Sequence, residues 1–255
     1  MIDTHCHLTD QRLGQQLPAV LQRAAAAGVE HMLTIATSID DSERCVELCR
    51  DLPQVRCTVG IHPSEADGRS LTQVPRLADL QKSPAVVAMG EMGLDYHYEF
   101  VPRTSQLAVF EAQIALADQL NRPVVIHCRQ ATDDVLAVLK NHPKVPAVFH
   151  CFTDGLEQAR RILDSGYLLG FTGIVTFKRS DSLRQVALQT PLDRMLVETD
   201  APYLTPEPHR KRTINEPAMV VHVAALLARL KDVSIEELDQ QTTENASRLF
   251  RWDCR

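Results

Sequence analysis

The sequence predicts an α/β protein of the (β/α)8 TIM-barrel class. Three observations predict it: eight short β-rich runs recur along the chain, helix-like segments separate them, and no glycine-rich phosphate turn follows the first run. Strands that alternate with helices indicate βα units and a parallel sheet, and eight such units in 255 residues match a barrel in number and size. An open doubly wound sheet is the alternative, but it usually shows a glycine-rich turn after its first strand.

The β-rich runs are short and mostly apolar. In chain order they are IDTHC, HMLTIAT, VRCTVG, AVVAMG, PVVIHC, AVFHCF, YLLGFT and MLVETD. Helices are expected at 15–28, 40–52, 70–82, 104–121, 130–142, 155–166, 180–189, 216–231 and 234–248. Gly28 and Gly166 stand where a helix should end before the next strand, while Pro123 and Pro146 precede strands at positions where a missing N–H does little harm. No linker or low-complexity tract divides the chain, so a single domain over 1–255 is expected.

The composition restricts the class of protein. Hydrophobic residues make up 44% of the chain, which is ordinary for a globular protein with a sizeable core. No basic segment followed by an apolar run opens the sequence, and the longest late apolar stretch, AMVVHVAALLA, is interrupted by His222 and too short to span a bilayer. Seven cysteines without a C-x-x-C pair fit reduced thiols. We therefore expect a cytoplasmic protein without a membrane contact, and no obligate protein partner is evident.

Charge and aromatic content bear on nucleic-acid binding. The formal net charge is −6 and aromatic residues make up only 5% of the chain. A protein that holds nucleic acid along a long track usually shows a basic stripe or stacking aromatics, and neither is conspicuous here. If the substrate is a polynucleotide, a bound metal would have to supply much of the attraction.

Residue types that bind metals gather at the ends of the predicted strands. Within DTHCH the side chains of Asp3, His5 and His7 alternate, so they would share one face of the first strand. A single histidine in such a place is more often hydrogen-bonded structure than a ligand. The joint set is different, because catalytic groups of a barrel converge at the C-terminal ends of its strands. Six candidates would meet there: His5, His7, Glu91, His127, His150 and Asp200.

Four histidines and two carboxylates suit two divalent cations, with one carboxylate bridging them. The cysteines provide an internal check on this set. Cys6, Cys128 and Cys151 each follow a candidate histidine directly, so their thiols should point to the opposite side of the strand. We interpret them as small buried apolar residues rather than ligands, and we interpret Cys45 and Cys49, four apart on a predicted helix, in the same way.

The ordered motifs DTHCH, GIHP, GEMGLDYH, PVVIHCR, FHCFTDG, GFTGIVTF and ETDAPYL…NEP resemble the TatD family of metal-dependent deoxyribonucleases over residues 2–217. The resemblance implies a TIM barrel of the metal-dependent hydrolase type over 1–255 that cleaves phosphodiester bonds of DNA, with 3'-5' exonuclease action as one form of that activity. It implies one divalent ion at His5, His7, Glu91 and Asp200. It implies a second at Glu91, His127 and His150, with Glu91 bridging. Mixed nitrogen and oxygen ligands accept Zn, Mg, Mn or Ni.

Several further residues acquire candidate roles from their positions. Asp200 and Glu91 are the candidate catalytic residues, and Asp200 would take the proton from the attacking water. Asp3 would lie behind the ligands as their partner, and Glu198 would either orient a histidine or serve as buried structure. Candidates for substrate contact are the rim residues His62, Asp95 and Arg129 and the basic-loop residues Arg210 and Arg212, whose register within PEPHRKRTINEP is open.

Two other kinds of function remain open at this point. One is a metal-dependent hydrolase of a different bond, such as the ester of an aminoacyl-tRNA or a small cyclic amide. Many amidohydrolases bridge their metals through a modified lysine on strand four, whereas AVVAMGEMG contains no lysine, which favours the nuclease-like branch. The other is a metal-binding or nucleic-acid-binding protein without catalysis, against which stands the complete ligand set.

Overall fold

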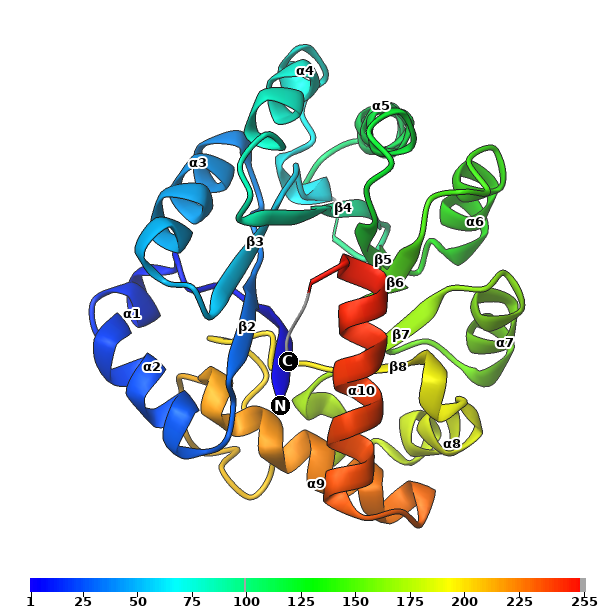
Figure 1. Cartoon of the computed structure of the whole chain (residues 1–255). Helices are drawn as coiled ribbons and strands as arrows, with labels where there is room; N and C mark the ends of the chain where they lie inside the picture. The colour runs from blue at the N-terminus through cyan, green and yellow to red at the C-terminus, as the bar shows by residue number, and fades with distance from the viewer. Residues whose placement is uncertain (99, 253–255) are drawn as a thin grey trace. The chain divides into compact units, whose positions relative to one another are not determined.

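Eight parallel strands alternate with helices along the chain, and the fold class is the (β/α)8 TIM barrel that the sequence predicts (Figure 1). This computed structural model describes residues 1–98 and 100–252, so the last three positions of the expected 1–255 domain lie outside the described residues. The chain divides into two compact units: the terminal unit, Met1–Thr34 with Cys151–Arg255, and the central unit, Ile35–His150. The expectation of a single domain stays a prediction.

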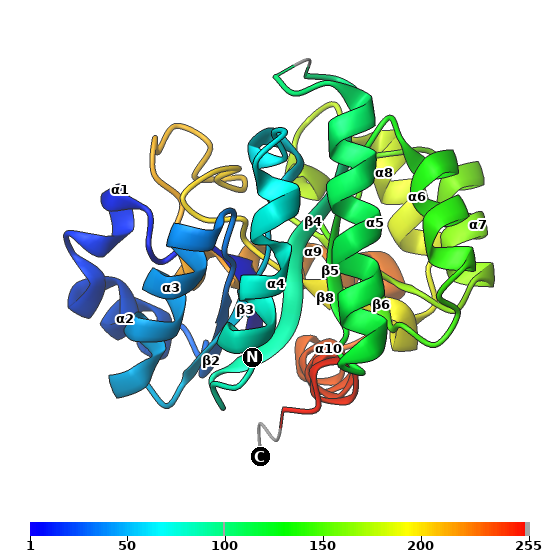
Figure 2. The same ribbon diagram turned by 90° about the horizontal axis from the view of Figure 1, so that it is seen from above.

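The central unit contains four parallel strands in chain order, and its helices lie along their outer side (Figure 1). The strands are β3 (Val55–Val59), β4 (Val86–Asp95), β5 (Val124–Arg129) and β6 (Ala147–Phe149). The helices are α3 (Ile39–Leu48), α4 (Ser70–Leu80), α5 (Arg103–Gln119) and α6 (Thr132–Lys140), with the 3-10 turns η1 (Cys49–Asp51) and η2 (Pro63–Glu65). Figure 2 shows α5 beside β4 and β5.

The terminal unit contains the other four strands, in which β1 pairs with β2 and β7 pairs with β8, both parallel. The strands are β1 (Ile2–Cys6), β2 (His31–Thr34), β7 (Leu168–Phe171) and β8 (Met195–Val197). The helices are α1 (Gln11–Gly14), α2 (Leu17–Ala26), α7 (Leu156–Asp164), α8 (Asp181–Gln189), α9 (Val220–Lys231) and α10 (Ile235–Phe250), with 3-10 turns at Gly173–Thr176, Leu192–Arg194 and Pro217–Met219.

Helix boundaries follow the punctuation in the sequence. The hydroxyl of Ser38 accepts a hydrogen bond from the Asp41 amide at the start of α3, and Ser234 accepts one from Glu237 at the start of α10. Gly28 and Gly166 adopt φ of +81° and +87° after α2 and α7, as expected of glycines that end a helix. The helix α1 was not expected from the sequence, because it is only four residues long. Asp10 caps its start.

Three strands end three residues before the ends of their β-rich runs, and one ends five residues after its run. Strands β2, β6 and β8 stop at Thr34, Phe149 and Val197, whereas β4 continues to Asp95. Asp200 and Cys151 adopt φ of +56° and +45°, which no continuing strand allows. His150 and Asp200 therefore lie in loops that follow their strands, and strand alternation does not set the direction of their side chains.

Glu91 lies inside β4, at a break in the pairing register with β5 between Met89 and Met92. Glycine is required close by: Gly93 has a φ of +145°, and a Cβ there would overlap the His127 carbonyl oxygen. The close approach of β4 to β5 thus depends on a residue without a side chain.

Replacement of Gly93 by alanine is expected to lower the free energy of unfolding by about 3 kcal/mol, because both the positive φ and the overlap with β5 oppose a methyl group. Urea unfolding followed by circular dichroism measures the loss. Gly68→Ala is the matched control, since nothing lies within 4 Å of the Cβ position at Gly68. Equal stability of the two variants would contradict the expectation.

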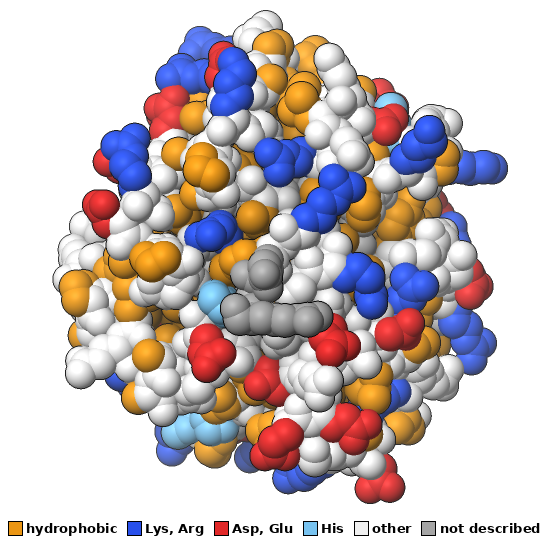
Figure 3. Space-filling view, viewed as in Figure 1, with side chains coloured by type: hydrophobic (Ala, Val, Ile, Leu, Met, Phe, Trp, Pro, Cys, Tyr) orange, Lys and Arg blue, Asp and Glu red, His pale blue; other side chains and the backbone are white. Residues whose placement is uncertain are grey.

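The surface carries the mixture of charges that the composition suggests, but it also exposes aromatic rings that the low aromatic content does not suggest. Lys and Arg side chains are interspersed with Asp and Glu on the face drawn in Figure 3. Of the described residues, the exposed large apolar side chains include three aromatics, Tyr98, Phe100 and Tyr203. A low aromatic content therefore does not prevent partly exposed rings at the surface. Among the described helices, none combines the length and apolarity needed to cross a membrane.

Candidate metal centre

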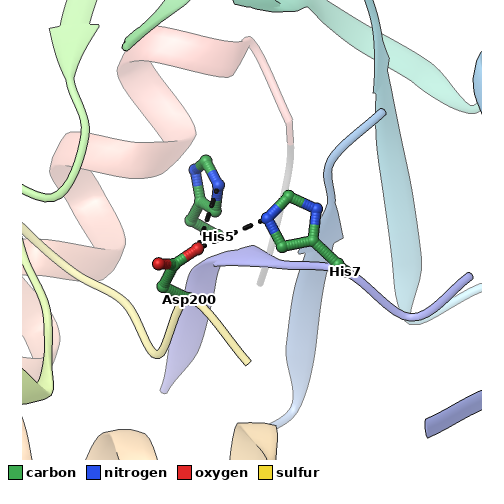
Figure 4. Close-up of side chains that lie close together, drawn as sticks. All are labelled: His5, His7 and Asp200. Carbon is green, nitrogen blue, oxygen red and sulfur yellow. Dashed lines mark ion pairs between the residues drawn. The ribbon is translucent and has the colours of Figure 1, made fainter. Parts of the chain in front are cut away.

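In the terminal unit, two histidines converge on one carboxylate (Figure 4). His5 lies within β1 and is fully buried, while His7 follows the strand and Asp200 follows β8. The Asp200 Oδ1 atom lies 3.3 Å from His7 Nε2 and 3.7 Å from His5 Nε2. These three residues, the terminal cluster, were all expected as ligands.

Backbone contacts fix the terminal cluster from behind. The Asp200 amide donates to the His5 carbonyl at 2.8 Å, and the His7 amide donates to the Ala201 carbonyl at 2.7 Å. Asp3 accepts from the Thr199 amide at 2.9 Å and from the Thr199 hydroxyl at 2.6 Å. Burial raises the pKa of Asp3 to about 8, although the hydrogen bonds from Thr199 and His5 oppose the rise. Asp3 thus joins β1 to the segment that carries Asp200.

Glu198 is almost completely buried, and its carboxylate contacts the backbone. Its Oε1 atom accepts a hydrogen bond from the Cys151 amide at 2.5 Å. A Cβ at Gly170 would overlap the same carboxylate, so β7 leaves room for it only because that position is glycine. Of the two interpretations of Glu198, these contacts favour buried structure.

Asn215 holds the segment around Asp200 and was not expected as part of the site. Its side chain is fully buried, and its Nδ2 atom donates to the Thr199 carbonyl at 3.0 Å and to the Tyr203 carbonyl at 2.6 Å. Its Oδ1 atom accepts from the Glu216 amide at 3.0 Å. The motif NEP was visible in the sequence, but only the fold shows that its asparagine spans the 199–203 turn.

Asn215→Ala is expected to destabilise the chain by about 2 kcal/mol, because two buried carbonyl groups lose their donor. It should also weaken divalent-metal binding at least about tenfold, since the Asp200 turn is no longer held. Chemical unfolding and isothermal titration with Mn²⁺ measure the two effects. The exposed Asn141→Ala variant should change neither quantity, and a stable Asn215→Ala protein with unaltered affinity would exclude this positioning role.

In the central unit, three histidines surround the Glu91 carboxylate. Its Oε1 atom lies 2.8 Å from His127 Nδ1, 2.7 Å from His150 Nε2 and 3.7 Å from His62 Nε2. Burial by itself raises the pKa of Glu91, but the charges of His150 and His62 and the hydrogen bond with His127 outweigh it and hold this pKa well below its usual range. Glu91 is therefore a buried anion. We call these four residues the central cluster.

A second carboxylate faces the other side of the His127 ring. Asp95 Oδ2 lies 3.0 Å from His127 Nε2, and Asp95 Oδ1 accepts from the amides of His97 and Tyr98, both at 2.9 Å. Burial opposes ionisation, yet these contacts lower the pKa of Asp95 to about 2. Burial also opposes protonation of His127, but the two carboxylates raise the pKa of its ring. Asp95 thus connects the central cluster to the segment after β4.

Two buried glutamines of α5 hold the loops of the central cluster. Gln106 donates to the carbonyls of Asp95 and Val101, both at 3.0 Å, and accepts from the Asp95 amide at 2.8 Å. Gln113 exchanges hydrogen bonds with the backbone of Ile61, at 2.8 and 3.0 Å. Sequence reasoning missed both residues. The available signal was a pair of amides seven residues apart, on the helix face that packs inward.

The remaining candidates are spread over both units. In the central unit, His62 belongs to the Glu91 cluster, with Ser64 on its Nδ1 atom, and the Arg129 guanidinium lies 4.7 Å from the centre of the Tyr98 ring. In the terminal unit, Arg210 packs 3.9 Å from the centre of the Phe177 ring, and Arg212 pairs with Glu216 at 3.3 Å. Both loop arginines are exposed, and each already has a protein contact.

The cysteines make contacts typical of structural thiols. Cys6 Sγ lies 3.5 Å from the Leu33 carbonyl oxygen, Cys128 Sγ lies 3.6 Å from the Thr132 hydroxyl at the start of α6, and Cys151 Sγ lies 3.5 Å from the Thr172 hydroxyl. Cys45 and Cys49 are both buried. No cysteine belongs to a group of described residues with the spacing of metal ligands.

Both clusters fit a divalent cation by the chemistry of their donors. The ligand atoms of His5, His7 and Asp200 lie within 4.8 Å of one another, and so do those of His62, Glu91 and His127. Each group combines imidazole nitrogen with carboxylate oxygen, the donor mixture that Zn²⁺, Mn²⁺ and Ni²⁺ accept. Each unit therefore offers a cation site of its own.

Comparison with known proteins agrees with this chemistry. The family model described as TatD related DNase matches residues 2–251. The chain is 39% identical to the uncharacterized metal-dependent hydrolase YabD of Bacillus subtilis, covering 98% of this chain and 99% of that protein. It is 37% identical to the 3'-5' ssDNA/RNA exonuclease TatD of Edwardsiella piscicida, with the same shares covered.

A solved structure shares the fold over almost the whole chain. The TatD homologue YJJV of Escherichia coli superimposes with a TM-score of 0.92 at 31% identity, covering 99% of this chain and 98% of that one. A hydrolase of the TatD family from Entamoeba histolytica superimposes with a TM-score of 0.89 at 24% identity, covering 98% of this chain and 97% of its own, and it shows the fold alone.

Proposed function

The chain belongs to the family of TatD-related DNases and is a metal-dependent hydrolase of ester bonds, and on that premise we propose that it is a nuclease that cleaves phosphodiester bonds of DNA with two divalent ions. The observation that carries the proposal is the pair of carboxylate-centred histidine clusters, one in each unit. A relative named as a 3'-5' ssDNA/RNA exonuclease supports the substrate class and the direction.

One ion would be held by His5, His7 and Asp200, and the other by Glu91, His127 and His150. The short distances from Glu91 Oε1 to His127 and His150 support the second set. That Glu91 also ligates the first ion stays a prediction, and so does the choice among Zn, Mg, Mn and Ni. When bound, divalent cations stabilise the charge that develops on phosphoryl oxygens and make water a nucleophile at neutral pH.

Asp200 accepts the proton of the attacking water in this proposal. One of its carboxylate oxygens faces His5 and His7, and the other points away from both rings and is the proposed acceptor (Figure 4). Its side chain is 15% exposed, against 4% for Glu91, so Asp200 is the carboxylate that water reaches more readily. Glu91 keeps its negative charge and orients the histidines around it.

His62 donates a hydrogen bond to a substrate phosphate in this proposal. The Ser64 amide donates to His62 Nδ1 at 3.1 Å, which leaves Nε2 as the nitrogen that can donate. Arg129, Arg210 and Arg212 supply positive charge to the phosphate backbone, and Asp95 positions substrate through the loop that it holds. The seven cysteines without a C-x-x-C pair support a cytoplasmic location.

The test uses metal-stripped protein to which Mg, Mn, Zn or Ni is added back. Single-stranded DNA labelled at the 5' end and the same DNA labelled at the 3' end are digested in parallel. A 3'-5' exonuclease gives a one-nucleotide ladder from the first substrate and releases the label of the second as a mononucleotide at once. Both reactions should depend on the added metal.

Two results would overturn the nuclease proposal. Metal uptake with hydrolysis of an aminoacyl-tRNA ester or a small cyclic amide, but no digestion of DNA, would establish the alternative hydrolase. Metal uptake and a band shift with DNA, without turnover of any substrate, would establish a binding protein that has no catalytic activity.

A further inference from the structure

An exposed aromatic step follows β4 in the central unit. The rings of Tyr98 and Phe100 stack with their centroids 5.3 Å apart and their planes 18° from parallel. Phe100 is 73% exposed, the largest value among the exposed large apolar side chains of the described residues, and Tyr98 is 44% exposed. Two stacked rings left open to solvent offer a flat π surface to a ligand.

Cationic and polar groups border this step. The guanidinium of Arg129 lies 4.7 Å from the centre of the Tyr98 ring, and the His97 ring meets Tyr98 edge-on at 4.7 Å. Gln130 approaches His97 Nδ1 at 3.3 Å. A planar stack beside a guanidinium is the combination that binds a base together with its phosphate.

The step is fixed to the central cluster by hydrogen bonds. Asp95 accepts from the Tyr98 amide with one oxygen and faces His127 Nε2 with the other. The Tyr96 amide donates to the Arg129 carbonyl at 2.9 Å, because Asp95 and Arg129 are partners in the β4–β5 ladder. Gln106 of α5 also holds the Asp95 backbone, because it accepts a hydrogen bond from the Asp95 amide and donates one to the Asp95 carbonyl oxygen. These contacts therefore hold the Tyr98 backbone near a candidate ligand of the metal, and the Phe100 ring stacks on Tyr98.

We infer that Tyr98 and Phe100 form a seat for one unpaired nucleobase of a single-stranded substrate, with Arg129 on the adjoining phosphate. The inference rests on the proposed nuclease function and deepens it. A base can stack on the Phe100 ring only when it has left its own neighbours, so the seat favours single strands over duplex. Stacking is tolerant of sequence because every base has a π face, so no strong base preference is expected.

The test compares the wild type with Phe100→Ala, Phe100→Leu and Tyr98→Ala, and with Leu71→Ala as a control at an exposed apolar residue of α4. The substrates are a single-stranded oligonucleotide and a series in which one nucleotide in turn is abasic. Loss of the ring should raise KM about tenfold and leave kcat within about twofold, the size of one base–aromatic stack. Leucine should not restore KM, because it fills space without a π face.

The abasic series identifies the seated base. For the wild type, KM should rise by the same factor when one particular nucleotide is abasic. For Phe100→Ala, an abasic site at that position should raise KM no further. A second readout needs no hydrolysis: 2-aminopurine at that position should be quenched by metal-stripped wild type and not by Phe100→Ala. Unaltered KM and unaltered quenching in both alanine variants, or losses that add at every abasic position, would overturn the inference.

The failures of the two proposals are distinguishable. Quenching by the wild type without digestion of any oligonucleotide would refute the nuclease and retain the base seat. Metal-dependent digestion that is indifferent to Phe100 and Tyr98 would retain the nuclease and refute the seat.

Discussion

Replacing Glu91 with glutamine is expected to lower kcat/KM for metal-dependent hydrolysis about a thousandfold. Glutamine keeps the volume of the side chain, but it removes the buried negative charge on which His62, His127 and His150 converge. In the variant, the amide nitrogen of the glutamine would face imidazole nitrogens that in the wild type face a carboxylate oxygen, which is a hydrogen-bond acceptor. Metal content measured by mass spectrometry should fall together with activity, because the carboxylate is a proposed ligand as well as an orienting group.

The Glu91→Gln comparison needs a control for folding. Glu111→Gln, on the exposed side of α5, should retain metal content, activity and unfolding midpoint. Circular dichroism should show Glu91→Gln folded, because its side chain is isosteric. A folded variant that keeps its metal and loses less than about tenfold in kcat/KM would show that Glu91 has no central role.

That the candidate ligand residues lie near strand ends could be predicted from the sequence, because the fold class determines where strand ends lie. Histidine and carboxylate types recur at the ends of βα units, and the alternation of strands with helices is strong enough to locate those ends within a few residues. The exact positions of these side chains were harder to predict from the sequence. His150 and Asp200 lie in loops after strands that end early, at residues whose backbone a periodic pattern does not describe.

The supporting contacts could not be predicted for a related reason. Asn215 and Gln106 act on backbone groups that are close only after folding, so no local pattern marks them. The aromatic step shows the same limit in composition. A 5% aromatic content indicates few rings, but it does not show where they lie. Tyr98 and Phe100 stack on each other and are exposed to solvent after β4.

Asp200→Asn is expected to lower kcat about a hundredfold to a thousandfold while changing KM by no more than a few fold. Asparagine retains the shape of the side chain and tolerates the φ of +56° at this position, so the hydrogen bond from the amide of residue 200 to the His5 carbonyl has no reason to break. The loss should therefore fall on the charge and on acceptance of the proton, which are needed in the reaction more than in binding.

Asp232→Asn is the matched control for Asp200→Asn, because Asp232 has a nearly identical φ of +55° and ends α9 at an exposed position. It should leave kcat unaltered. Metal content separates the two roles of Asp200: if Asp200→Asn binds one ion fewer, the ligand role dominates, and if it binds the full complement with a lowered kcat, the base role does. A fully loaded variant with kcat within about threefold of the wild type would exclude Asp200 as the proton acceptor.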